Sequence, residues 1–248
     1  MAATFPDLLS SLLAADPGRP LVTFYDDATG ERVELSVATW ANWVAKTSSL
    51  LVEEFDLERG DRVLIDLPTH WLGPVFLGAA WNAGLAVTFD GSDAAADAVI
   101  CGPATVVTYA DRGGSAPVLA TALLPLGVRF ADPLPAGVHD FGVEVWGQPD
   151  SFLPWDPPQA DDLALLAGPD GPAATTQAEL VTPATGEAWD LVAGGGRLLT
   201  TANPASPTGL ATFVAPLVSG GSTVWVAHAD PDSLERKYAA EQATGQLH

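Results

Sequence analysis

Short apolar runs alternate with helical patterns along residues 60–101, and this alternation restricts the possible folds more than any other feature of the chain. Residues 63–67 and 85–89 are apolar enough for central strands of a sheet. Residues 69–83 place bulky apolar side chains at helical spacing, and Gly84 follows as expected at a helix end. Strands joined by helices are typical of parallel sheets. The sequence therefore predicts an α/β fold with doubly wound, mostly parallel sheets flanked by helices.

The sequence on either side of this region adds elements of both kinds. Residues 26–30 have the composition of a tight turn between two short strands, which predicts a hairpin. Ser36 predicts the start of a helix that ends at Glu53 and Glu54. The other expected elements are a helix over residues 5–15, hairpin strands over 21–25 and 32–35, a short helix over 94–96, and strands over 98–101 and 106–109.

Residues 148–161 contain four prolines and therefore predict a linker without regular structure. The linker would separate a first α/β subdomain, residues 1–147, from a second and incomplete one, residues 162–248. A parallel unit of about three strands leaves an open edge that favours pairing with a partner. In the second subdomain we expect strands over residues 164–167, 198–201 and 222–226, and helices after Thr176, near 210–217 and over 231–242.

The charge of the chain limits its partners. It carries 31 acidic and 10 basic residues, which gives a net charge of −21. Nucleic acids and anionic membranes are bound through Lys and Arg, so we expect neither as a partner. The N-terminus lacks the basic and apolar regions of a signal peptide, and no apolar stretch reaches about 18 residues. The sequence therefore predicts a cytoplasmic protein.

Residues 162–180 have the strand, Gly-rich loop and helix layout of a phosphate-binding loop, but the loop lacks the chemistry. Such a loop needs converging backbone N–H groups, and usually a Lys beside a Ser or Thr. Here Pro169 and Pro172 remove two N–H donors, and Asp170 adds negative charge where the ligand would be negative. No Lys lies in this stretch. The layout of a nucleotide site is thus present without the groups that bind phosphate.

Six segments, in order along the chain, resemble the N-terminal part of the adenylate-forming enzymes, the superfamily of acyl-CoA synthetases, luciferases and nonribosomal adenylation domains. Gly60-Asp-Arg-Val is similar to the family's "GDRV", and residues 165–180 stand where the family has "YTSGTTGxPKGVxxTHxxL". The resemblance implies the family's α/β fold. The six segments are residues 34–40, 60–64, 77–87, 165–180, 201–210 and 219–234.

The departures from the family pattern concern the catalytic positions. The chain ends before the family's adenine-binding motif, its ribose-binding Asp and the lid that carries the catalytic Lys. The resemblance therefore implies a truncated N-terminal domain with a degenerate phosphate loop, with no catalytic residue, metal ligand or cofactor. The loop positions are Gly168, Asp170, Gly171, Thr175 and Thr176; Ala173 stands at the loop Lys, Thr176 and Gln177 at "TH", and Ala205 and Ser206 near "LFH".

The histidines are candidates for other chemistry. His70 is interpreted as a polar residue at a helix start rather than a base, because no partner is evident. His139 beside Asp140, and His228 near Asp230, are acid–histidine neighbours without metal-ligand spacing.

The remaining reactive or bulky residues are interpreted as structural. Cys101 is alone, so no intrachain disulfide forms, and its apolar run indicates a core thiol. The eight Trp are expected mainly in the core, although some could line an acyl or aryl pocket. Residues 194–196, three glycines, lead into a strand and are a poor phosphate site.

Three hypotheses about function remain open. The first is a non-catalytic protein derived from an adenylate-forming enzyme, which binds a partner or a small acyl or aryl ligand. The second is half of a carboxylate–CoA ligase or adenylating enzyme, completed in trans by another chain. The third, compatible with the first, is a homodimer or other homo-oligomer whose interface covers the incomplete sheet.

Overall fold

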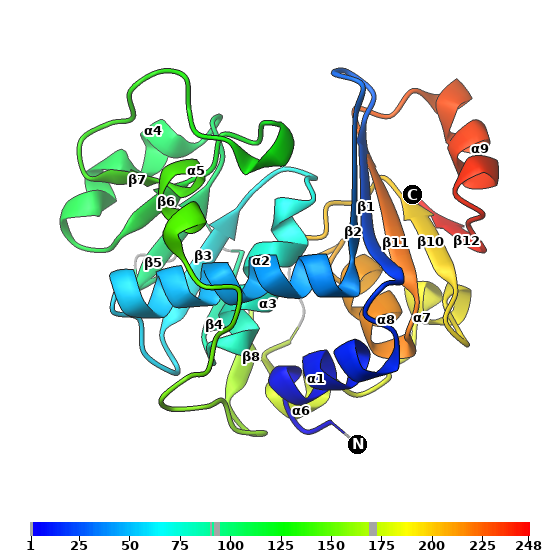
Figure 1. The fold of residues 1–248 in the computed structure, drawn as a ribbon, viewed down its shortest axis with the longest axis horizontal. Coiled ribbons are helices and arrows are strands. Elements are labelled where there is room, and N and C mark those ends of the chain that lie inside the picture. The colour runs from blue at the N-terminus through cyan, green and yellow to red at the C-terminus, as the bar shows by residue number, and fades with distance from the viewer. Residues whose placement is uncertain (1, 90, 92–94, 169–172) are drawn as a thin grey trace.

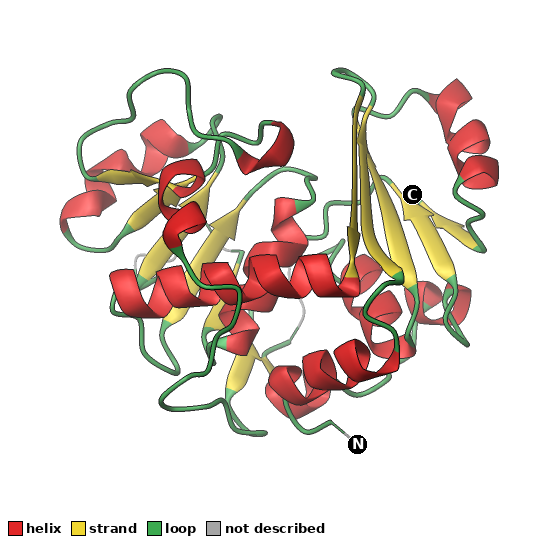
Figure 2. Cartoon of the chain, viewed as in Figure 1, coloured by secondary structure: helices red, strands yellow, loops and turns green. Residues whose placement is uncertain are grey.

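A computed structural model describes residues 2–89, 91, 95–168 and 173–248 (Figure 1). The strands form two sheets, and helices lie between the sheets and on their outer faces (Figure 2). Most neighbouring strands are parallel, so the α/β class predicted from the sequence is confirmed.

The first sheet combines the two ends of the chain. Among the described residues it has five strands in the order β12-β10-β11-β1-β2. Neighbouring strands are parallel except β1 and β2, which form the predicted antiparallel hairpin. The strands are β1 (Pro20–Asp26), β2 (Glu31–Ser36), β10 (Arg197–Thr200), β11 (Ser222–Ala227) and β12 (Gly245–Leu247).

The second sheet has seven strands in the described part of the chain, in the order β7-β6-β5-β3-β4-β8-β9. Neighbouring strands are parallel except β8 and β9. The strands are β3 (Arg62–Asp66), β4 (Ala86–Thr88), β5 (Ala98–Cys101), β6 (Val118–Ala120), β7 (Val138–Asp140), β8 (Leu163–Leu165) and β9 (Thr175–Thr176).

The helices begin where the sequence provides caps. Ser36 accepts a hydrogen bond from the Thr39 N–H and starts α2, as predicted. The α-helices are α1 (Phe5–Ala15), α2 (Val37–Ser49), α3 (Leu72–Asn82), α4 (Val106–Tyr109), α5 (Phe141–Glu144), α6 (Gln177–Leu180), α7 (Glu187–Leu191), α8 (Ala211–Ser219) and α9 (Pro231–Ala240). A π-helical turn, η1 (Leu50–Glu54), continues α2, and the 3-10 turns are η2 (Ala110–Gly114), η3 (Pro125–Gly127) and η4 (Val145–Gly147).

An aromatic core joins α1, α2, α3 and α8. The Phe5 ring lies 6.0 Å from that of Trp40 and 5.6 Å from that of Trp81. The Phe213 ring is 5.7 Å from Trp40 and 6.1 Å from Trp81. Both of these indole N–H groups donate to backbone carbonyl oxygens, so neither polar atom is left unpaired by burial.

The prediction for the Trp residues is confirmed for most of them. Trp146 and Trp155 are the exceptions, with 53% and 94% of their surface exposed. Trp40, Trp71, Trp81 and Trp225 are fully buried, and Trp43 and Trp189 pack partly buried against the core.

Residues 148–161, all of which the structure describes, form neither helix nor strand. The division into subdomains of residues 1–147 and 162–248 stays a prediction, and the sheets do not follow it. Val87 of β4 pairs with Leu165 of β8, and β1 pairs with β11. The three strands expected in the second subdomain therefore do not form a sheet of their own. The chain's own hairpin extends the first sheet beside β11, and the edges of this sheet are β12 and β2.

The strand predicted over residues 106–109 is wrong, because these residues form α4. Val106 and Tyr109 are buried, whereas 77% of Val107 is exposed. Burial at a spacing of three residues matches a helix and not the two-residue period of a strand. The short helix expected over residues 94–96 falls partly outside the described residues, and residues 95 and 96 are not helical.

Candidate functional site

The predicted phosphate-loop residues lie between β8 and α6, with β9 intervening. Gly168, Thr175 and Thr176 are described and partly buried. Asp170 and Gly171 lie outside the described residues. The strand, loop and helix order expected from the sequence is therefore present around the loop.

The polar groups at the end of this loop are already hydrogen-bonded. Thr176 caps α6, and its hydroxyl accepts from the Glu179 N–H at 3.3 Å. The Glu179 carboxylate accepts in return from the Thr176 N–H at 2.8 Å and lies 3.0 Å from its hydroxyl. The Thr175 hydroxyl donates to the Ala173 carbonyl at 3.0 Å. The capping box of Thr176 and Glu179 orders the helix start. Both threonine hydroxyls are thus hydrogen-bonded within the chain.

Glu179 also brings negative charge to this place. The Thr176 N–H lowers the pKa of the Glu179 carboxyl, so the group is ionised at neutral pH. A carboxylate at this point would repel a phosphate group.

An apolar hollow of about 240 Å³ lies beside the loop, and we call it the loop pocket. Thr175 and Glu179 stand on its wall, and most other lining side chains are apolar. None of the described residues that line it is Lys or Arg. The apolar part of the wall consists of Leu165, Leu180, Ala184, Trp189, Pro207, Leu210, Ala211 and Val214.

The segment after β10 shapes one side of the loop pocket. The Asn203 amide donates to the Leu67 carbonyl at 2.6 Å, and Asn203 and Ser206 form the local turns before α8. Ala205 is buried. The positions where the family resemblance places an aromatic residue and a His therefore serve as packing and turn residues in this chain.

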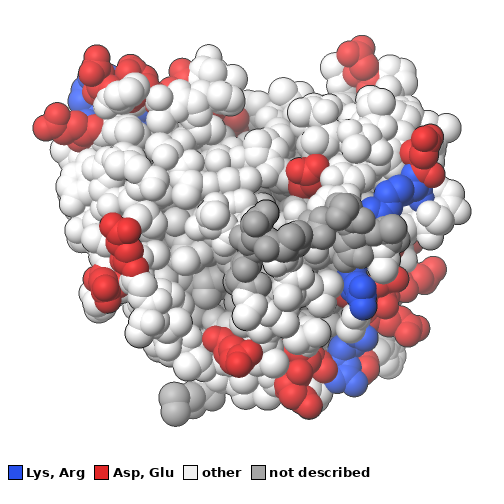
Figure 3. Space-filling model, turned by 180° about the vertical axis from the view of Figure 1, so that it is seen from behind, with Lys and Arg blue, Asp and Glu red and all other residues white. Residues whose placement is uncertain are grey.

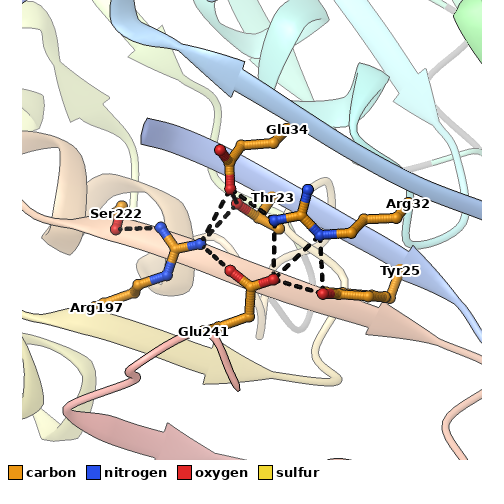
Figure 4. Close-up of polar contacts among 7 residues, drawn as sticks. All are labelled: Thr23, Tyr25, Arg32, Glu34, Arg197, Ser222 and Glu241. Carbon is orange, nitrogen blue, oxygen red and sulfur yellow. Dashed lines mark hydrogen bonds and ion pairs between the residues drawn. The ribbon is translucent and has the colours of Figure 1, made fainter. Parts of the chain in front are cut away.

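Seven polar side chains meet on one face of the first sheet, and we call them the arginine cluster (Figure 4). They come from four strands and from the residue that follows α9, so the fold alone brings them together. The members are Thr23, Tyr25, Arg32, Glu34, Arg197, Ser222 and Glu241.

Glu241 is the centre of the arginine cluster. Its carboxylate accepts from the Tyr25 hydroxyl at 2.5 Å, from Arg32 at 2.9 and 3.1 Å, and from Arg197. Burial opposes ionisation of Glu241, but these donors outweigh it and hold the pKa of the carboxyl below its ordinary value. Arg32 and Arg197 also reach Glu34, at 2.8 and 3.5 Å.

The three candidate histidines have different partners. His70 precedes α3 and its Nδ1 accepts from the Leu72 N–H at 3.2 Å, as expected for a helix-start residue. Only 4% of His70 is exposed, and burial lowers its pKa to about 3. The Nδ1 atom of His139 lies 2.8 Å from the Glu144 carboxylate. His139 therefore pairs with Glu144 and not with its neighbour Asp140.

His228 pairs with Asp26 at 2.8 Å and not with Asp230, whose carboxylate caps α9 instead. Cys101 is fully buried, and burial raises its pKa to about 12, which confirms a core thiol. Within the described ranges, no group of three or more His, Cys, Asp or Glu is arranged to hold a metal ion. None of the helices built from the described residues is long and apolar enough to cross a membrane.

On the face opposite to that of Figure 1, the Lys and Arg side chains lie at the margins, near Asp and Glu side chains (Figure 3). Arg59 is one of the paired cations, since it contacts Asp156 at 2.8 Å and Asp162 at 3.1 Å.

The fold has solved counterparts. An acyl-CoA synthetase from Brucella canis aligns with a TM-score of 0.73 and 16% identity, over 98% of this chain and 51% of that chain. MatB from Rhodopseudomonas palustris aligns with a TM-score of 0.71 and 20% identity, over 96% of this chain and 48% of that chain. A benzoate CoA ligase from Burkholderia xenovorans LB400 aligns with a TM-score of 0.73 and 19% identity, over 98% of this chain and 49% of that chain. The fold is therefore that of the N-terminal part of the adenylate-forming enzymes, and the chain spans about half the length of these proteins.

No family model matches the chain. A Mycobacterium tuberculosis (strain ATCC 25618 / H37Rv) protein described as a TIGR03089 family protein is 38% identical over 244 residues, which cover 96% of this chain and 95% of that protein. The chain belongs to the TIGR03089 family.

Proposed function

We propose that this chain is a non-catalytic, cytoplasmic binding protein with the fold of the adenylate-forming enzymes, and that its loop pocket takes a small acyl or aryl group. The observation that carries the proposal is the wall of that pocket. It combines apolar side chains with a single charged one, Glu179, at the end of the degenerate phosphate loop.

The chemistry of adenylation supports the non-catalytic part of the proposal. Transfer of an adenylyl group to a carboxylate requires positive charge around the phosphates as pyrophosphate leaves. Ala173 stands where the family resemblance places a Lys, and the Thr176 hydroxyl is held in the capping box with Glu179. The chain thus replaces phosphate-binding groups by groups that stabilise the start of α6.

The size of the loop pocket supports the ligand class. An apolar cavity of about 150 Å³ is enough for a benzene ring. At about 240 Å³ the loop pocket has room for one ring or a short acyl chain, but not for a nucleotide as well. Its apolar wall favours an uncharged ligand, because Glu179 would repel a carboxylate.

A partner protein or a second copy of the chain also belongs to the proposal. Leu153 and Trp155 are 89% and 94% exposed, and exposed side chains of this size are common at interfaces. The alternative of an enzyme completed in trans is favoured by one observation, that the chain spans about half of its solved counterparts. In that case the second chain would have to supply the cations that the loop lacks.

Calorimetric titration with benzamide and hexanamide, two uncharged probes, tests the ligand. We expect 1:1 binding to the unmodified chain and loss of binding in Ala211→Trp, because Ala211 is exposed on the pocket wall and an indole there fills the pocket. Ala239→Trp, at an exposed position of α9, is the matched control and should bind normally. Absence of binding to the unmodified chain, or equal binding by Ala211→Trp, would overturn the proposed ligand site.

A further inference from the structure

A second hollow, of about 440 Å³, lies at the amino ends of β1, β10 and β11, next to the arginine cluster. We call it the arginine hollow. It is separate from the loop pocket, since the two share no lining residue. Its charged and polar lining residues are Arg19, Glu34, Arg197, Ser222, Glu241 and Gln242.

Arg19 is a cation that forms no ion pair with another described residue. Its Nη1 donates to the Gly221 carbonyl at 2.5 Å, and its buried Nη2 has no acceptor in the described part of the chain. Burial lowers the pKa of Arg19, and Asp16 opposes this from beyond ion-pair distance. A buried guanidinium N–H without an acceptor indicates a missing ligand or water.

Arg197 presents a second unused donor. Its Nη1 and Nη2 donate to Ser222 at 3.2 Å and to Thr23 at 3.0 Å, and Nη2 also contacts Glu241. Its buried Nε has no acceptor among the described residues. Two arginines of one hollow thus each keep a buried N–H group without an acceptor among the described residues. Guanidinium groups are strong donors to oxyanions.

The charges that line the arginine hollow balance. The guanidinium groups of Arg19 and Arg197 stand against the carboxylates of Glu34 and Glu241. Arg32, outside the lining, bonds to both carboxylates and offsets part of their negative charge. In a chain of net charge −21, such a balanced hollow repels an anion less than a surface with excess acidic groups.

Two glycine-rich turns form the floor of the hollow. A Cβ atom on Gly221 would lie 2.2 Å from the Gly196 carbonyl oxygen, so the turns can approach this closely only without a side chain there. The N–H groups of Gly195, Gly196, Gly221 and Ser222 already bond to carbonyl oxygens. These four N–H groups are therefore not available to a phosphate, and the arginine side chains are the donors.

We propose that the arginine hollow binds the phosphate group of a small phosphate-bearing molecule. Guanidinium groups match the geometry of phosphate oxygens and donate to two of them at once. The volume of the hollow exceeds that of a single phosphate ion and leaves room for the organic part of a phosphate ester. The same donors would also hold inorganic phosphate, and the two sources of the phosphate group are distinguished by experiment.

The test uses calorimetric titration of the full chain at low salt with glycerol 1-phosphate and with inorganic phosphate. We expect 1:1 binding that weakens with added NaCl, and affinity about tenfold lower in Arg19→Ala, the loss expected for charge-assisted hydrogen bonds. Arg236→Ala, which removes an exposed arginine of α9, is the matched control and should bind normally. Tighter binding of the ester identifies a phosphate ester as the ligand, and equal or tighter binding of phosphate identifies the free ion.

The absence of binding to the unmodified chain by either probe would overturn the proposal, as would unchanged affinity in Arg19→Ala. Thermal unfolding of Arg19→Ala shows whether the variant is folded, and Arg19→Lys, which keeps the charge, should retain part of the affinity. Neither result depends on the loop pocket, whose probes are uncharged.

Discussion

The Glu241 carboxylate, which follows α9, accepts a hydrogen bond from the Tyr25 hydroxyl of β1 at 2.5 Å. The contact joins residues from opposite ends of the chain across one face of the first sheet (Figure 4). The α9 side chains Leu234 and Tyr238 pack on Leu199 and Val224 of the same face. Glu241 therefore fixes the end of α9 against the strands, and the stability of this face depends on its charge.

Glu241→Gln should destabilise the protein by about 1.5–3 kcal/mol, because Arg32 and Arg197 lose one of the two carboxylates that they contact and only Glu34 remains. Only 8% of the Glu241 side chain is exposed. Urea unfolding measures the change. Glu235→Gln, an exposed charge on the same helix, is the control and should change the free energy of unfolding by less than about 0.5 kcal/mol. A similar effect of the two variants would contradict the role of Glu241.

The same group sets a pH dependence. The pKa of Glu241 is lower in the folded chain than in the unfolded one. Its contribution to stability is therefore fully present above the ordinary Glu pKa of about 4.3 and is lost as the pH falls through the lowered folded value. Glu241→Gln should flatten the acid part of the stability profile. A profile with the same acid slope in both proteins would argue against this assignment.

His70 should lower the stability of the folded chain during acidification, beginning at a higher pH than the effect of Glu241. Its folded pKa of about 3 lies below the ordinary value of about 6.5, so only the unfolded chain takes up the proton between these limits. The free energy of unfolding should therefore fall by up to about 1.4 kcal/mol per pH unit as the pH drops below about 6.5. His70→Asn, which can still accept from the Leu72 N–H, should reduce this slope, whereas His248→Asn, at an exposed position, should not.

Gly78→Ala should be destabilising by about 1–3 kcal/mol, because a Cβ atom there would lie 2.7 Å from Trp40 and 2.9 Å from Val44 in the aromatic core. Gly147→Ala is the matched control, since nothing lies within 4 Å of its added Cβ atom. Thermal unfolding of both variants distinguishes tight packing from the general effect of replacing Gly. Equal stability of the two would show that α2 and α3 do not approach so closely.

Cys101 should resist thiol reagents in the folded protein. It is fully buried and its pKa is raised to about 12, so both access and thiolate formation are suppressed at pH 8. Labelling should be slow in buffer and rapid in urea, with the rate in buffer limited by unfolding. Rapid labelling of the native chain would mean that the strand end at Cys101 is exposed.

The sequence predicted the parts of the fold that carry their own periodicity. The hairpin around residues 26–30, the helix α1 and the strand β5 lie where turn residues, apolar spacing and short apolar runs place them. The strands β6, β7 and β12 were not predicted, because three residues each are too few to show an alternation.

The sites were less accessible to sequence reasoning. Thr175 and Thr176 were found through the family resemblance, but their use in a turn and a capping box follows from hydrogen bonds to Ala173 and Glu179. The assignment of Asp170 and Gly171 to the degenerate phosphate loop stays a prediction, because both lie outside the described residues. The arginine cluster gave no signal, because its members are scattered over four strands and the residue after α9. The pairing of β1 with β2 and the parallel pairing of β1 and β10 with β11 bring the strand residues together.

Exchange of labelled pyrophosphate into ATP, with a panel of small carboxylic acids and Mg²⁺, tests the central claim most directly. We expect no exchange above that of the heat-denatured chain. Acid-dependent exchange by the purified chain, lost when Thr175 and Thr176 are both replaced by Ala, would show that the loop is a working catalytic element and that the chain is not a non-catalytic binding protein.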